Sequence, residues 1–197
     1  MARKYEQRQR AESQAETRRR IVEATVALHE TLGPGRTTIS AIAEAAQVQR
    51  LTVCRYFSDD LALFRACSAH WLAANPAPDP ALWAGIADPA RRLQTALDEI
   101  YAFFRATEGM TSNLLRDLPG SPALQEAAAP FLQYWEQVRV VLARGWATRG
   151  RRREITRAAI GHAIEFETWR SLVRQGLEDH AAAQLMVALV CSVEDAR

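Results

Sequence analysis

TTISAIAEAAQVQRLTVCRYFSDDLALF, from Thr37 to Phe64, is the stretch that decides the fold of this chain. Its first apolar residues recur at the spacing of one helix face, at Ile39, Ile42, Ala43 and Ala46. Thr38 stands just before them, where its hydroxyl can cap the helix. Residues 47–49 are short enough to form a turn, and a second helix is predicted over residues 50–56. The stretch therefore predicts two short helices joined by a tight turn.

The second helix of this pair has an inner and an outer face. Val53 and Phe57 are expected to point inward. The outer face carries hydrogen-bond donors and acceptors of the kind that meet phosphates and base edges in a major groove. The residues expected to bind DNA are Thr38, Gln49, Arg50, Leu51, Thr52, Cys54, Arg55 and Tyr56.

Helices are also predicted on both sides of this pair. One runs from about Gln14 to Leu32 and ends at a Gly-Pro-Gly break; the other runs from about Asp59 to Ala74. In this order, RRRIVEATVALHETLGPGRTTISAIAEAAQVQRLTVCRYFSDDLALF resembles the N-terminal DNA-binding domain of TetR-family transcriptional regulators. The rest of the chain has the length and helical character of that family's ligand-binding domain.

Four residues depart from the pattern of the family. Gln47 and Leu51 stand where it commonly has glycine, Cys54 where it commonly has tyrosine, and Asp60 where it often has a phosphate-binding lysine. An unusual operator or weaker phosphate anchoring would fit these changes. Gln47 is also expected to hold a left-handed conformation that suits glycine better.

The resemblance and the helix signals together imply an all-α fold of about nine helices. A three-helix helix-turn-helix DNA-binding domain comes first, and a larger helical domain for ligand binding and dimerisation follows. The predicted divisions are a basic flexible arm at residues 1–12, the DNA-binding domain at 13–58, a connecting helix and proline-rich link at 59–87, and the second domain at 88–197. Within the second domain, helices are predicted near residues 88–108, 110–117, 121–147, 152–175 and 179–195, with a kink at Pro130.

The charge of the chain is uneven. The net charge is only +2, but residues 1–20 hold seven basic and three acidic side chains. Residues 1–65 have a balance of +3 and residues 66–197 of −1. A basic arm ahead of a helix-turn-helix suits attraction to DNA phosphates, and a solvated, partly disordered leader is the alternative interpretation.

The sequence contains no pattern for a membrane span, a metal site or an active site. No apolar run approaches the roughly 18–20 residues that cross a bilayer. The three cysteines are odd in number and far apart, which fits a reducing cytoplasm. There is no glycine-rich phosphate loop and no nucleophile beside a base, so we expect no metal, no cofactor and no enzymatic activity.

Large aromatic side chains concentrate beyond the DNA-binding domain, where all five tryptophans lie. TetR-like second domains usually bind a small effector between their middle helices, so the resemblance implies a pocket for a hydrophobic or aromatic molecule. The candidates for its lining are Tyr101, Phe104, Met110, Asn113, Leu114, Phe131, Trp135, His162, Phe166 and Trp169. Asn113 and His162 would orient the ligand. The alternative for each residue is ordinary core packing.

The last two predicted helices carry apolar stripes that, in the resembling family, form a four-helix dimer interface. The stripes are Ile155, Ala159, His162, Ala163, Phe166 and Arg170 on one helix and Ala182, Leu185, Met186, Leu189, Val190 and Val193 on the other. A homodimer suits a palindromic double-stranded DNA operator. The arginine-rich run at residues 149–153 is expected to be a solvated loop or to form ion pairs at the rim of this interface, rather than to bind nucleic acid.

The function expected from these features is that of a dimeric transcriptional repressor released from its operator by an effector. Two alternatives remain open at this stage. One is a redox-responsive regulator that acts through Cys54 on the DNA-binding face. The other is an all-helical ligand-binding protein that has lost DNA reading.

Overall fold

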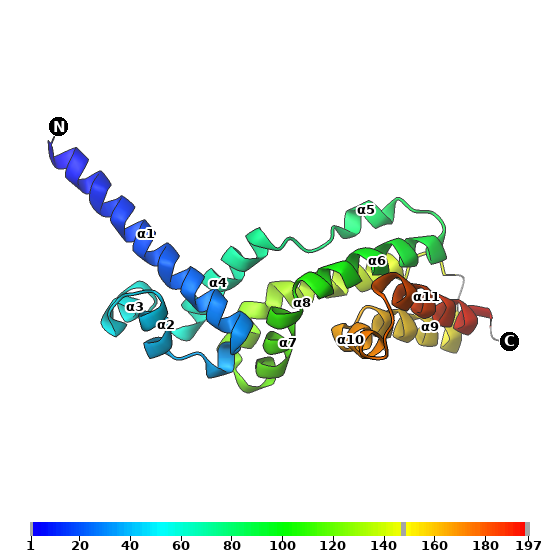
Figure 1. Cartoon of the computed structure of the whole chain (residues 1–197). Helices are drawn as coiled ribbons and strands as arrows, with labels where there is room; N and C mark the ends of the chain where they lie inside the picture. Colours follow the sequence, from blue (N-terminus) through cyan, green and yellow to red (C-terminus); the bar gives the residue numbers. More distant parts are fainter. Residues whose placement is uncertain (1, 147–148, 196–197) are drawn as a thin grey trace. The chain divides into compact units, whose positions relative to one another are not determined.

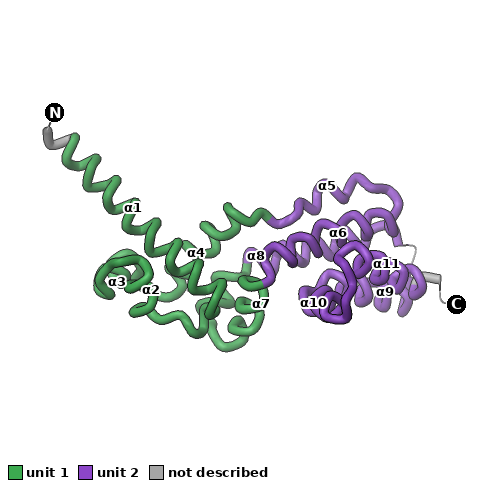
Figure 2. Tube along the Cα trace, viewed as in Figure 1, with its two compact units in different colours: residues 1–76, 109–129 green, residues 77–108, 130–197 purple. Residues whose placement is uncertain are grey.

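The computed structural model describes residues 2–146 and 149–195 (Figure 1). Eleven α-helices and two short 3-10 helices make up these ranges, and no strand occurs in them. The all-α class is confirmed, with two helices more than the nine or so predicted. No helix of the described residues is both long enough and apolar enough to cross a membrane. The chain divides into unit 1, residues 1–76 with 109–129, and unit 2, residues 77–108 with 130–197 (Figure 2).

Unit 1 contains the helix-turn-helix pair. Its helices are α1 (Ala2–Thr31), the 3-10 helix η1 (Pro34–Arg36), α2 (Ile39–Ala45), α3 (Arg50–Tyr56), α4 (Asp60–Ala74), most of α7 (Glu108–Asp117), the 3-10 helix η2 (Leu118–Gly120) and the start of α8 (Pro122–Leu142). The helix α1 begins well before the predicted Gln14. Residues 2–12, expected as a flexible arm, are therefore helical.

The core of unit 1 is formed by the apolar faces of α1 to α4. Its members are Ile21, Val22, Ile42, Ala43, Ala46, Val53, Phe57, Leu63 and Cys67. Side-chain caps begin two of these helices, because Thr38 accepts the backbone N–H of Ala41 at 3.1 Å and Asp59 accepts that of Ala62 at 2.8 Å. The predicted cap at Thr38 is confirmed, and the caps fix where α2 and α4 start.

Unit 2 consists of α5 (Pro80–Ala84), α6 (Pro89–Ala106), the rest of α8, α9 (Gly150–Ala163), α10 (Phe166–Arg174) and α11 (Asp179–Asp195). The last helix, α11, packs against both α6 and α9. Pro130 lies inside α8, and the division between the two units falls at this residue.

The proline-rich link contains a helix that the sequence did not predict. Pro80 occupies the first turn of α5, where its missing N–H leaves no bond unmade, and Asp79 caps the helix by accepting the N–H of Ala81 at 2.9 Å. Trp83 is 1% exposed and its indole N–H donates to Glu99 at 2.9 Å. This tryptophan therefore fastens the link to α6.

The single helix predicted over residues 152–175 is wrong. The structure breaks it at Ile164 and Glu165, between α9 and α10, although no glycine or proline stands there. Ile164 and Phe166 are both buried. In one continuous helix they would point about 200° apart, so the break allows both to enter the core.

Candidate functional site

The two faces of α3 differ as the sequence predicts. Val53 is 0% exposed and Phe57 is 6% exposed, one helical turn apart. On the other face, Leu51 is 60% exposed. All eight predicted DNA-binding residues lie at or near the surface of unit 1: Thr38, Gln49, Arg50, Leu51, Cys54 and Arg55 are exposed, and Thr52 and Tyr56 are half-buried.

The turn before α3 is held in an unusual backbone conformation. Gln47 has φ of 53°, the left-handed value that its place in the turn predicts, and it is the one such non-glycine residue among the described ones. Arg20 of α1 donates to the backbone carbonyls of Ala46 and Gln47. A cation at the end of α2 also complements the helix dipole. Arg20 thus fixes the angle at which α3 leaves the turn, a role that its position in a basic run did not reveal.

The neighbouring arginines of α1 are also engaged inside unit 1. The guanidinium of Arg18 lies 5.0 Å from the centre of the Phe57 ring. Arg19 pairs with Glu16 at 2.7 Å and Glu23 at 2.6 Å, and these carboxylates raise the pKa of Arg19. The basic count of the first 20 residues therefore overstates the charge that is free to meet DNA.

Helix α7 clamps the end of α1. The side-chain amide of Asn113 donates to the carbonyls of His29 at 3.0 Å and Glu30 at 2.8 Å. Arg116 donates to the carbonyl of Leu32 at 2.8 Å, and Asp117 accepts the N–H of Gly35 at 2.9 Å. The bonds from Asn113 and Arg116 satisfy carbonyls that a helix end leaves without partners.

Gly33 lies at the contact between α7 and the end of α1, where a side chain would not fit. Its φ is 94°, which side chains rarely adopt, and a Cβ atom added there would lie 2.0 Å from the Arg116 guanidinium. The Gly-Pro-Gly break is thus shaped to receive α7, which the sequence showed only as a helix stop.

The cysteines of unit 1 differ in environment. Cys54 is exposed on α3, whereas Cys67 is buried on α4. Burial raises the pKa of the Cys67 thiol to about 12, because the thiolate is poorly solvated there. Cys67 is therefore an unreactive core side chain. Among the described residues, no group of three or more histidines, cysteines and carboxylates is placed to hold a metal ion.

The predicted ligand-lining residues fall into both units. Met110, Asn113 and Leu114 lie on α7 in unit 1, where Asn113 belongs to the clamp. The other candidates lie in unit 2, and their positions are Tyr101 and Phe104 on α6, Phe131 and Trp135 on α8, His162 on α9, and Phe166 and Trp169 on α10.

Six of the unit 2 candidates form an aromatic cluster with Phe104 at its centre: Tyr101, Phe104, Phe131, Trp135, Phe166 and Trp169. The Phe104 ring lies 5.4 Å from the rings of both Trp135 and Phe166. Burial is uneven, because Phe104 is 2% exposed whereas Phe131 and Trp135 are half-buried.

Two polar groups of the aromatic cluster are already satisfied. The Tyr101 hydroxyl donates to the carbonyl of Ala163 at 2.8 Å, and burial raises the pKa of this phenol. The Trp169 indole donates to Asp179 at 2.9 Å. His162 is exposed outside the cluster, with a ring nitrogen 3.2 Å from the Thr168 hydroxyl.

The predicted dimer stripes are partly internal. Ala163, Ala182, Met186 and Val190 are buried within unit 2 itself. Ile155 on α9 and Leu185 and Leu189 on α11 remain 40–49% exposed. These three side chains are the exposed large apolar residues of α9 and α11, two helices that pack together.

These features define a helix-turn-helix protein with a second, all-helical unit. Residues 21–67 match the family model described as "Bacterial regulatory proteins, tetR family". The chain therefore carries the DNA-binding domain of the TetR family of transcriptional regulators, and the resemblance read from its sequence is confirmed.

Solved structures share the fold over nearly the whole chain. HlyIIR, a haemolysin II transcriptional regulator, matches with a TM-score of 0.65 and 18% identity, over 89% of this chain and 97% of its own. NalD, the secondary repressor of the MexAB-OprM multidrug efflux pump in Pseudomonas aeruginosa, matches with a TM-score of 0.61 and 19% identity, over 92% and 97%. A putative fatty acid metabolism regulator of Clostridium perfringens has a TM-score of 0.64 at 15% identity, over 88% and 97%. No curated protein sequence matches the chain.

Proposed function

We propose that this chain is a dimeric transcriptional repressor of the cytoplasm that binds a palindromic operator and is released by a small effector. The observation that carries the proposal is the outer face of α3. Arg50 and Arg55 are exposed there, while Val53 and Phe57 anchor the opposite face in the core. The recognition helix can therefore enter a major groove without disturbing its own packing.

The composition of this face suits base reading. Arg50 and Arg55 can each donate two hydrogen bonds to guanine, and Gln49 can pair with adenine. Leu51, the exposed apolar residue at the start of α3, suits contact with a thymine methyl group. A leucine where the family commonly has glycine would thus change the operator sequence rather than abolish DNA binding.

The experiment is operator binding by single variants on DNA taken from upstream of the protein's own coding sequence. Arg50→Ala and Arg55→Ala should each weaken binding by about 1–3 kcal/mol and relax specificity at one base pair. Arg91→Ala removes the same charge from an exposed position on α6 and serves as the matched control. If both α3 variants bind like the parent, this face does not read DNA.

For the dimer, we propose the surface of Ile155, Leu185 and Leu189. Exposed apolar patches commonly mark interfaces, and a twofold dimer presents two α3 helices, as a palindromic operator with half-sites about 34 Å apart requires. Leu189→Glu should yield monomers in sedimentation, because an unpaired charge in a dry interface is strongly destabilising. Leu82→Glu, at a 70% exposed position on α5, is the matched control. A stable Leu189→Glu dimer would place the interface elsewhere.

For the effector, we propose a mostly apolar molecule that reaches the aromatic cluster through Phe131 and Trp135. These are its more accessible rings, whereas Phe104 is closed off by its neighbours. Helix α7 follows α6 directly in the chain, and its Asn113 and Arg116 hold the end of α1. An effector that favours a conformer with this clamp shifted would weaken DNA binding by the difference in its affinities for the two conformers.

A further inference from the structure

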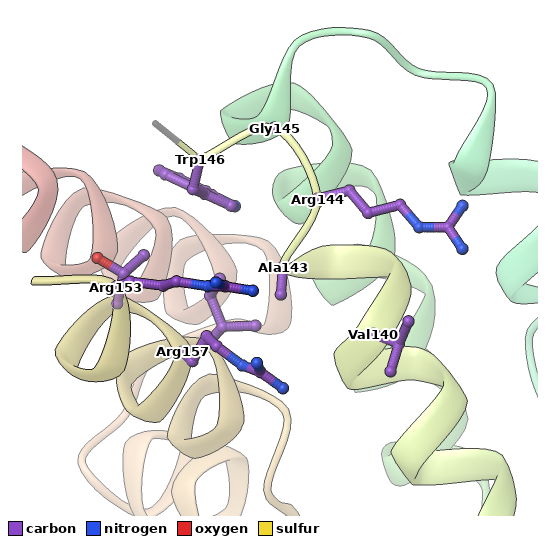
Figure 3. Close-up of a pocket in the computed structure, with 9 residues that line it drawn as sticks. Val140, Ala143, Arg144, Gly145, Trp146, Arg153 and Arg157 are labelled. Carbon is purple, nitrogen blue, oxygen red and sulfur yellow. The ribbon is translucent and has the colours of Figure 1, made fainter. Parts of the chain in front are cut away.

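Unit 2 contains a pocket apart from the aromatic cluster. It has a volume of about 390 Å³ and lies between the end of α8, the residues that follow it, and the part of α9 from Arg153 to Ile160 (Figure 3). This volume is within the range of about 300–1,000 Å³ that is usual for small-molecule sites. The pocket is therefore large enough for a compact organic ligand.

Two arginines give the pocket a basic wall. The run that the sequence suggested as a loop is helical from Gly150, so Arg153 and Arg157 stand one turn apart on α9. Both side chains extend from α9 toward the end of α8, whereas Arg144 points away from them (Figure 3). Within the described residues, neither Arg153 nor Arg157 pairs with a carboxylate. Two like charges at this spacing repel each other, and an anion between them would relieve that repulsion.

Apolar side chains from both α8 and α9 also line the pocket. Ile160 is 1% exposed and Val140 is 45% exposed, and both line the pocket. Trp146 also lines the pocket, and its indole N–H donates to the carbonyl of Leu142 at 2.9 Å. This bond fixes the ring at the rim of the pocket, where its apolar face can cover a ligand.

The turn that carries Trp146 is held from inside unit 2 by a third arginine. Arg92 is 4% exposed and donates to the carbonyls of Ile86 at 2.7 Å and of Arg144. Its Nε atom has no hydrogen-bond partner among the described residues. Asp88 lies near enough to favour the charged form of Arg92, but the hydrogen bonds of Arg92 go to backbone carbonyls. These bonds preorganise the turn that lines the pocket.

We propose that this pocket binds an amphipathic anion, with a carboxylate or phosphate head on Arg153 and Arg157 and an aliphatic or aromatic body against Trp146, Val140 and Ile160. Paired guanidiniums suit planar or tetrahedral oxyanions. A long nucleic-acid backbone would need an open groove, whereas this site is a small pocket with an apolar wall. Its use as an effector site rests on the proposed regulatory function, but binding itself does not.

The test uses the full chain without DNA and follows binding by calorimetry and by tryptophan fluorescence. The probes are decanoate, decyl phosphate, decanol and inorganic phosphate. Decanoate or decyl phosphate should bind at least tenfold more tightly than decanol, because only the charged heads can bond to the guanidiniums. Equal binding of decanol, or phosphate binding as tightly as decyl phosphate, would overturn the proposal.

Variants locate the site. Arg153→Gln and Arg157→Gln should each lower the affinity for decanoate roughly tenfold, and raised salt should weaken binding to the parent. Arg174→Gln removes an exposed arginine of α10 and should leave the affinity unchanged. Melting curves check that each variant folds. Undiminished decanoate binding by the folded double variant Arg153→Gln/Arg157→Gln would also overturn the proposal.

A final measurement separates this inference from the proposed function. Decanoate is added to the complex of the protein with its operator. Release of DNA by the parent but not by the double variant makes the pocket an effector site. If the chain binds no operator at all, the proposed function fails. The calorimetry on DNA-free protein still shows whether the pocket binds an amphipathic anion.

Discussion

The outer face of α3 and the aromatic cluster of unit 2 use their side chains in opposite ways. On α3, most of the candidate functional residues are exposed, two are half-buried, and the core residues Val53 and Phe57 are different ones. In the aromatic cluster, the candidate ligand residues are themselves the core, with Phe104 and Trp169 at 2% and 0% exposed. A change on α3 can therefore alter function alone, whereas a change at the centre of the cluster alters stability first.

This difference shows where a single sequence is informative. Helical periodicity separates inner from outer residues when only the inner face is apolar. It cannot separate a packed aromatic side chain from one that lines a cavity, because both face inward.

Phe104→Ala should have the largest effect. Removing a ring packed 5.4 Å from both Trp135 and Phe166 should cost about 3–5 kcal/mol of unfolding free energy. Operator binding and ligand response should then fail together, which is measured by denaturant unfolding and by binding on the same sample. Phe131→Ala, at the half-buried rim, should cost less. A Phe104→Ala protein of parental stability that binds operator but ignores ligand would make the cluster a pocket and remove the contrast.

Acid should weaken unit 1 through His29. Burial beside the Phe64 ring lowers the pKa of His29 to about 4, against the weaker effect of Asp117, which raises it. Between pH 6.5 and 4, His29 binds a proton in the unfolded chain but not in the folded chain. As the pH is lowered from 6.5 to 4, the unfolding free energy should therefore decrease by about 1.4 kcal/mol per pH unit, or about 3 kcal/mol in all.

The destabilisation is absent above about pH 7, reaches its full size near pH 4, and can be assigned to one unit. Hydrogen exchange resolved by peptide should show unit 1 opening more readily at pH 5 than at pH 7, and denaturant unfolding gives the total. His29→Gln should flatten the dependence in that window. The same slope in the variant would assign the acid sensitivity to other groups.

Removal of residues 1–12 should have the smallest effect. The structure places residues 2–12 in the first part of α1, where residues 5–12 are exposed and Arg8 is paired with Glu12 at 3.0 Å. Operator affinity should fall by a similar factor for all DNA sequences, and the salt dependence should become shallower as phosphate contacts are lost. Arg8→Gln/Arg10→Gln is the point-variant control. An unchanged salt slope would show that this segment does not contact DNA.

Local signals in the sequence determined the helix-turn-helix. The cap at Thr38, the turn at residues 47–49 and the bounds of α3 at Arg50 and Tyr56 all occur as predicted. They depend on hydrogen bonds and backbone preferences within a few residues, so the local sequence is sufficient to predict them. The helix starts at Asp59 and Asp88 have the same origin, since each aspartate caps its own helix.

Tertiary structure alone decided the features that join distant residues. Arg20 holds a turn 26 residues away, and Asn113 holds the end of α1 at a separation of 84 residues. The break between α9 and α10 arises in the same way, and so does the pocket that Arg153, Arg157 and Trp146 line together. These contacts exist only after helices pack, because which carbonyls lack partners and which charges share a pocket depend on the packing and not on the spacing of residues along the chain.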